Sequence, residues 1–252
     1  MKRKLLPLCA VLLLAAWAAV AQVPAGPRVV ASTSWIAAFA RAAGATDVVT
    51  IAPIELRHPP EYELKPSDLM AVHGARFLLY SGYERFAARL AETAGAEGLE
   101  VIQVYTDNLP SKFKEEARKL ALRFGTMASY EAWERSFDLQ AAAMRSAVAA
   151  AYPDRRAAVH KYLRTFAEWL GFEVVGTFGP GEPAPAVLLE LSRTKPALVI
   201  DNYHNPSGKA VARATGAPIV ELINFPGKDG TLTIEDVFAR NERALLESAP
   251  RR

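Results

Sequence analysis

The sequence is short of cysteine, histidine and long hydrophobic runs. Its 252 residues include one cysteine, Cys9, and four histidines. Cys9 lies inside the apolar run over residues 5–20, and no later stretch has the length needed to span a membrane. Disulfide bonds, thiolate nucleophiles and cysteine metal ligands are therefore excluded beyond that run. Any soft-metal chemistry has to depend on histidine.

The N-terminus has the three parts of a secretory signal. Lys2, Arg3 and Lys4 precede the uncharged run, which ends in the small-residue sequence Ala19-Val20-Ala21. We predict a signal peptide over residues 1–21, which implies a periplasmic or other extracytoplasmic location. The alternative is an uncleaved anchor, because about 16 apolar residues come close to the roughly 20 that span a bilayer.

The charge of the chain argues against a nucleic-acid partner. The sequence has 30 Lys and Arg against 27 Asp and Glu, and its pI is near 9.0. Three of the cations belong to the predicted signal, so the remaining chain has 27 charges of each sign. The basic pI thus comes from the signal and gives no reason to expect binding to an anionic polymer.

Beyond the signal, apolar β-branched runs alternate with amphipathic stretches. The predicted strands cover residues 28–32, 48–54, 77–80, 101–105, 157–159, 172–177, 197–200 and 219–223. The predicted helices cover residues 35–43, a short stretch from Ser67, 84–94, 112–152 with a break at Gly125 and Thr126, 162–170, 186–194, 208–214 and 234–247. Such alternation is typical of βαβ units and parallel sheets.

We therefore predict an α/β protein with two lobes, each a parallel sheet flanked by helices. One long helix, with too few breaks to be several shorter ones, should join them. The expected organisation is an N-terminal lobe over 22–126, a linking helix over 127–152 and a C-terminal lobe over 153–252.

Polar residues follow several of the predicted strands. In an open parallel sheet, ligands bind beyond the carboxyl ends of the strands. The residues found there are His58, Glu61, Asp107, His160, Asp201, His204 and Asn224. The remaining histidine, His73, falls inside a short helix, where we expect a structural or surface role.

Three histidines at strand ends in both predicted lobes indicate a metal site. Imidazole is a common ligand of zinc, which takes four ligands in proteins. We predict His58, His160 and His204 as ligands, with Asp201 as first choice for the fourth position. Alternatively, Asp201 only caps a turn or holds His204 in place. Additional or supporting candidates are Glu61, Asp107 and Asn224.

Two motifs resemble the metal-specific solute-binding proteins of ABC transporters, the bacterial zinc and manganese binders. Pro60-Glu61-Tyr62-Glu63, followed by Pro66-Ser67-Asp68-Leu69, is similar to the family's Asp-Pro-His-Glu-Tyr loop leading into Pro-Ser-Asp-Leu. His160, 11 residues before Gly171, is similar to the family's second-lobe histidine. The family's pattern is also matched by Gly181-Glu182-Pro183, Gly216 and Asn241. The resemblance therefore covers nearly all of the chain after the signal.

The chain departs from the family at the metal ligands. Pro60 stands where the family has its first histidine, and residues 106–111 lack the second. Asn224 aligns with the family's last carboxylate. His204 is a gain at a position that is not usually a ligand in the family.

The resemblance implies a non-enzymatic, monomeric receptor that delivers a divalent metal to a membrane permease with its ATPase. Three imidazoles favour Zn²⁺. Mn²⁺ is the less favoured alternative, because it prefers more carboxylates than this ligand set contains. The long helix should keep lobe closure small.

A second hypothesis is a receptor for an organic or chelated-metal ligand, with a cleft lined by Trp35, Tyr62, Tyr83 and Tyr203. A third is a secreted zinc hydrolase with Glu61 as general base, although no HExxH motif is present.

Overall fold

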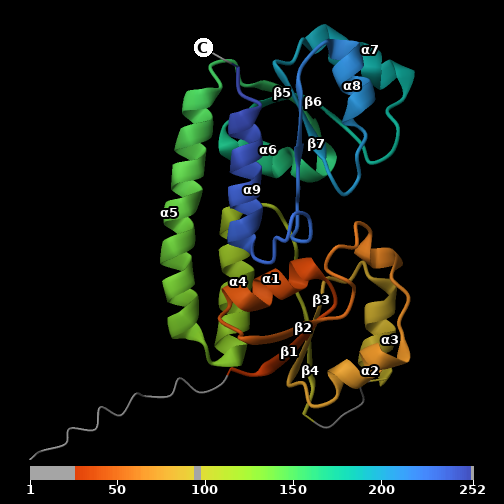
Figure 1. Ribbon diagram of the computed structural model, residues 1–252, viewed down its shortest axis with the longest axis vertical. Helices are drawn as coiled ribbons and strands as arrows, with labels where there is room; N and C mark the ends of the chain where they lie inside the picture. Colours follow the sequence, from red (N-terminus) through yellow and green to blue (C-terminus); the bar gives the residue numbers. More distant parts are fainter. Residues whose placement is uncertain (1–25, 94–97, 251–252) are drawn as a thin grey trace, which may run out of the picture.

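The computed structural model describes residues 26–93 and 98–250, and these form two parallel sheets, one above the other in Figure 1. The predicted signal peptide lies outside the described residues. In the first sheet the strand order is β2-β1-β3-β4, and in the second it is β6-β5-β7-β8. The strands are β1 Arg28–Ala31, β2 Asp47–Thr50, β3 Phe77–Tyr80, β4 Glu100–Gln103, β5 Arg156–His160, β6 Glu173–Phe178, β7 Leu198–Asn202 and β8 Ile219–Leu222. Every neighbouring pair is parallel.

The helices cover the sheets and run along one side of both. The first lobe has α1 Ser34–Ala42, the 3₁₀ turn η1 Pro59–Glu61, α2 Pro66–Val72 and α3 Arg85–Thr93, and the second has η2 Lys161–Leu163, α6 Arg164–Leu170, α7 Pro185–Thr194 and α8 Gly208–Thr215. Between them in sequence come α4 Pro110–Phe124 and α5 Met127–Ala151, and α9 Ile234–Glu247 closes the chain. In Figure 1, α5 extends along both lobes with α9 beside it. The predicted α/β fold with two lobes and a long linking helix is confirmed.

The core is continuous between the two lobes. Phe238 of α9 is 1% exposed and contacts aromatic rings of α4, α5 and α6. Tyr152, directly after α5, donates its hydroxyl hydrogen to the carbonyl of Leu245 in α9 at 2.6 Å. Close-packed interiors do not deform continuously. The lobes are therefore held by a shared body of helices as well as by the linker.

No helix in the described part of the chain combines the length and apolar character that a membrane crossing requires.

Asn241→Ala in α9 is expected to lower the free energy of unfolding by about 2 kcal/mol. The buried Asn241 amide accepts from the backbone N–H of Ile223 at 2.9 Å and donates to its carbonyl at 2.8 Å. Removing it leaves two buried backbone groups without partners, each costing about 1 kcal/mol or more. Urea unfolding measures the loss, and Arg243→Ala, an exposed change on the same helix, serves as control. Equal urea midpoints for the two variants would show that the Asn241 amide does not stabilise the folded protein.

Candidate functional site

A cavity of about 600 Å³ lies between the lobes, at the carboxyl ends of strands from both sheets. The first lobe contributes Trp35, His58 and Asp107 to its lining, and the second contributes Tyr162, Asn205 and Phe225. Ligands of parallel sheets bind beyond the carboxyl ends of the strands, and here the strand ends of both lobes face the same space. The cavity is the candidate binding site.

The two lobes touch each other around the cavity. Asn108 donates from Nδ2 to the carbonyl of Tyr162 at 3.0 Å, and the Thr165 hydroxyl donates to Asp107 Oδ1 at 3.1 Å. On another side, the Ser34 hydroxyl donates to the carbonyl of Pro226 at 2.8 Å. Gly227 follows, and a Cβ added there would lie 2.2 Å from the carbonyl oxygen of Ile54 in the first lobe. The lobes are thus in direct contact in this conformation.

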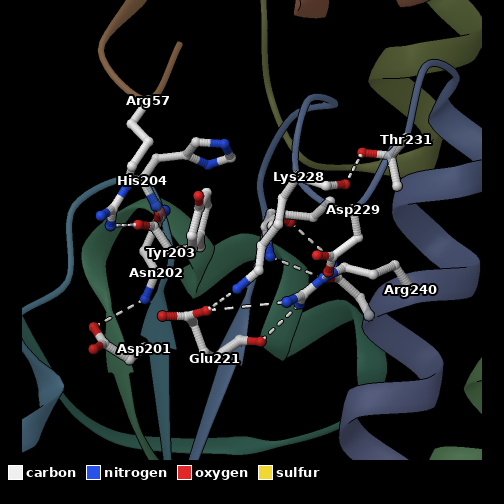
Figure 2. A network of polar contacts seen from close by, with 12 residues as sticks. Arg57, Asp201, Asn202, Tyr203, His204, Glu221, Lys228, Asp229, Thr231 and Arg240 are labelled. Carbon is white, nitrogen blue, oxygen red and sulfur yellow. Dashed lines mark hydrogen bonds and ion pairs between the residues drawn. The ribbon is translucent and has the colours of Figure 1, made fainter. Parts of the chain in front are cut away.

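Arg57 adds a charged link between the lobes. Figure 2 shows its side chain reaching from the first lobe to Tyr203, whose carbonyl accepts from Nη2. The guanidinium also lies over the Tyr203 ring, 4.3 Å from its centroid, and the Lys228 ammonium lies 4.0 Å from the same centroid. Glu221 pairs with Lys228 and so holds that ammonium in place. A cation over an aromatic face is stabilised by the ring quadrupole.

His58 and Glu61 differ in their relation to the cavity. His58 is exposed, precedes η1 and lines the cavity, so its imidazole is available to a ligand there. Glu61 is exposed at the end of η1 and is not part of the lining. His73 is exposed at the end of α2, as expected for a surface residue.

His160 is fully buried at the end of β5, beneath the cavity lining. Its Nδ1 accepts from the backbone N–H of Tyr162 at 3.2 Å, so the neutral ring carries its proton on Nε2. That Nε2 has no hydrogen-bond partner. Burial lowers the pKa of His160, and the nearby Asp201 carboxylate acts in the opposite direction. In this conformation Nε2 of His160 therefore carries a hydrogen, whereas coordination of a metal by Nε2 would require a lone pair on that atom.

The free Nε2 of His160 lies close to Gly179 and Ser207. A Cβ added at Gly179 would lie 2.4 Å from His160 Nε2 and 2.8 Å from Ser207 Oγ, and the backbone of Gly179 has a φ of +71°. Only glycine suits that position. The hydroxyl of Ser207 is also buried without a partner. The sequence did not single out these two residues, because nothing in their local pattern marks them.

Asp201 caps the turn before α8. Its Oδ1 accepts from the backbone N–H groups of Asn202 at 2.9 Å and Ser207 at 3.1 Å. The side chain is 3% exposed and packs against Gly208. This is the turn-capping alternative considered for Asp201. The residue that holds His204 is a different one, Asn224.

His204 is oriented by Asn224 and by aromatic stacking. Its Nδ1 lies 2.7 Å from Asn224 Oδ1, which also accepts from Asn202 Nδ2 at 3.2 Å, so the His204 proton sits on Nδ1 and Nε2 keeps its lone pair. The ring stacks on Phe225, with centroids 3.5 Å apart, and Phe225 stacks on Trp35 of the first lobe. Burial lowers the pKa of His204 to about 3. The neutral form with a lone pair at Nε2 is therefore strongly favoured.

The structure does not bring the predicted ligands to one point. His58, Asp107 and Asn224 line the cavity, whereas His160, His204 and Asp201 are not part of its lining. Within residues 26–93 and 98–250, no group of three or more His, Cys, Asp or Glu side chains could hold a metal ion. The four-ligand site of His58, His160, His204 and Asp201 stays a prediction, and it is not assembled in this conformation.

Two cavity cations were missed at the sequence level. Arg57 and Lys161 both line the cavity, one from each lobe. Each directly adjoins a predicted ligand, Arg57 before His58 and Lys161 after His160. The position of each cation next to a histidine at a strand end could have indicated these two residues from the sequence.

The two-lobed fold is similar to that of several solved structures described as metal-binding or metal-transporting proteins. The laminin-binding protein Lmb of Streptococcus agalactiae, described as an adhesin with metal-transporting activity, matches with a TM-score of 0.68 at 17% identity, over 88% of this chain and 99% of that one. The solute-binding protein FpvC of Pseudomonas aeruginosa, in complex with Mn²⁺, matches with a TM-score of 0.67 at 17% identity, over 88% and 98%. A zinc-bound mutant variant of AdcAII of Streptococcus pneumoniae matches with a TM-score of 0.66 at 17% identity, over 89% and 100%. No protein-family model and no curated protein sequence matches the chain.

Proposed function

We propose that this protein is an extracytoplasmic solute-binding protein that captures a divalent metal between its lobes and delivers it to an ABC transporter permease with its ATPase. The observation that carries this proposal is the cavity lined from both lobes at the strand ends. It occurs in a fold shared with proteins described as metal-binding or metal-transporting. The protein acts as a monomeric receptor and not as an enzyme.

The donor atoms support zinc as the transported ion. His58 lines the cavity. His204 is buried outside the lining, but it keeps an unprotonated Nε2 because Asn224 holds the proton on Nδ1. Neutral imidazoles suit Zn²⁺ better than Mn²⁺. Coordination by His204, His160 or Asp201 requires a rearrangement, since none of the three lines the cavity. In addition, His160 Nδ1 is engaged by the Tyr162 N–H, and Asp201 caps a turn.

Zinc is expected to raise the free energy of unfolding by about 3 kcal/mol when its free concentration is a hundred times the dissociation constant. His58→Ala is expected to remove most of that rise, because it deletes the predicted imidazole ligand that lines the cavity. Thermal melting of protein purified without chelator, with and without zinc, measures the increment for each variant separately.

His73→Ala is the matched control, since His73 is an exposed histidine at the end of α2, away from the cavity lining. It should keep the full increment. If neither zinc nor manganese stabilises the unaltered protein, the proposed function is wrong. If His58→Ala keeps the whole zinc increment, the ion is held by other residues.

A further inference from the structure

The candidate cavity is far larger than a bare ion needs. Zinc bonds its protein ligands at about 2.0 to 2.3 Å, so a bare ion leaves almost no open volume around it. The cavity holds about 600 Å³. Sites for small organic molecules usually measure about 300 to 1,000 Å³. The space therefore suits an ion that arrives together with organic ligands.

The lining is poor in groups that bind transition metals. Among the described residues that line it, only His58 carries an imidazole and only Asp107 carries a carboxylate. Asp107 Oδ1 already accepts from the Thr165 hydroxyl. A zinc ion held by His58 and Asp107 alone would have two of its four coordination positions open to ligands that come with the ion.

The lining does contain groups that bind carboxylates. Arg57 and Lys161 face the space from opposite lobes, and neither forms an ion pair with any residue that the structure describes. Arg57 uses Nη2 for the Tyr203 carbonyl, which leaves further N–H donors on the guanidinium. Asn205 adds an amide from the second lobe. Two cations against one carboxylate disfavour a bare cation and favour an anion.

Apolar walls complete the cavity. Trp35 and Phe225 stack on one another across the two lobes, with centroids 5.6 Å apart, and both line the space. Tyr83 and Tyr162 line it as well. Mostly apolar walls with a few directed polar groups are usual for sites that bind organic ligands.

We propose that the solute is a divalent metal bound as a chelate by a small polycarboxylate, and that Arg57 and Lys161 bind the carboxylates while His58 faces the metal. This inference rests on the proposed function and names the form in which the metal is captured. The chelating carboxylates fill the coordination positions that the lining leaves open. Their remaining charge meets the two cations.

Equilibrium dialysis with zinc and citrate tests the proposal on the whole secreted chain. Zinc and labelled citrate are measured in the protein chamber after dialysis against zinc alone, citrate alone, or both together. We expect retention of zinc and citrate in equal amounts when both are present, and at least tenfold weaker retention of either one alone. Acetate at equal ionic strength should not replace citrate.

Variants at the two cations sharpen the test. Arg57→Gln and Lys161→Gln should each weaken retention of the chelate about tenfold, the loss expected for a hydrogen bond to a charged group. Lys209→Gln, an exposed lysine on α8, should leave it unchanged.

The other outcomes separate this inference from the proposed function. Full retention of zinc without citrate would overturn the inference and leave the metal receptor standing. Retention of citrate without zinc would overturn both, in favour of a receptor for organic anions. If neither is retained, the inference is wrong, and the zinc melting experiment described above then decides on the metal function by itself.

Discussion

Phe238→Ala is expected to lower the free energy of unfolding by about 3 to 5 kcal/mol, the range for truncating a fully buried phenylalanine. The ring lies 4.9 Å from Phe137, 5.4 Å from Phe166, 5.8 Å from Trp169 and 6.0 Å from Phe113, measured between centroids. These four partners come from α4, α5 and α6. The cavity left by the change would therefore open where the elements of both lobes meet.

Urea unfolding followed by circular dichroism measures this loss. Leu246→Ala is the matched control, because Leu246 lies on the same helix and is 40% exposed. Its expected cost is below about 1 kcal/mol. Because the core is shared, Phe238→Ala should shift a single transition. Two separate transitions, with only one of them shifted, would contradict a common core.

Acidification from pH 7 to pH 3.5 is expected to remove about 4 kcal/mol of stability through His204 alone, to order of magnitude. Burial lowers the pKa of His204 from 6.5 to about 3 in the folded protein. Between those two values the unfolded chain binds a proton that the folded protein does not. The contribution of His204 is thus fully present above pH 6.5 and is lost as the pH falls toward 3. His160, whose pKa burial also lowers, acts in the same direction.

The difference between variants isolates this effect from the carboxylates that titrate in the same range. His204→Gln should show a shallower loss of stability between pH 6.5 and pH 3.5 than the unaltered protein. His73→Gln changes an exposed histidine and should leave the pH profile as it is. Parallel profiles of stability against pH for His204→Gln and the unaltered protein would show that protonation of the His204 ring does not destabilise the folded protein.

The secondary structure was largely predictable because its signals are local. The strand at Phe77–Tyr80 and the helix at Ile234–Glu247 have the bounds that their apolar patterns indicate. The break predicted at Gly125 and Thr126 is where α4 ends and α5 begins. The helix expected from residue 162 instead begins at Arg164, because the His160 side chain caps the 3₁₀ turn before it. That cap depends on the orientation of one ring.

The candidate site was predictable only in part. His58, Asp107 and Asn224 lie at the cavity, as their places after predicted strands indicate. The same rule could not tell that His160 and His204 are buried beneath the lining. A strand-end position determines where a residue's backbone lies. It does not determine which way the imidazole turns.

The sequence by itself determined the α/β alternation, the two lobes and the edge of each sheet where polar groups collect, because periodicity and helix-ending signals act over a few residues. Only the tertiary structure decided the tautomers and partners of the imidazoles. Asn224 sets the proton of His204 from 20 residues away, and Trp35 of the first lobe stacks on the Phe225 that covers it. Such contacts depend on how distant segments pack, and no local pattern encodes them.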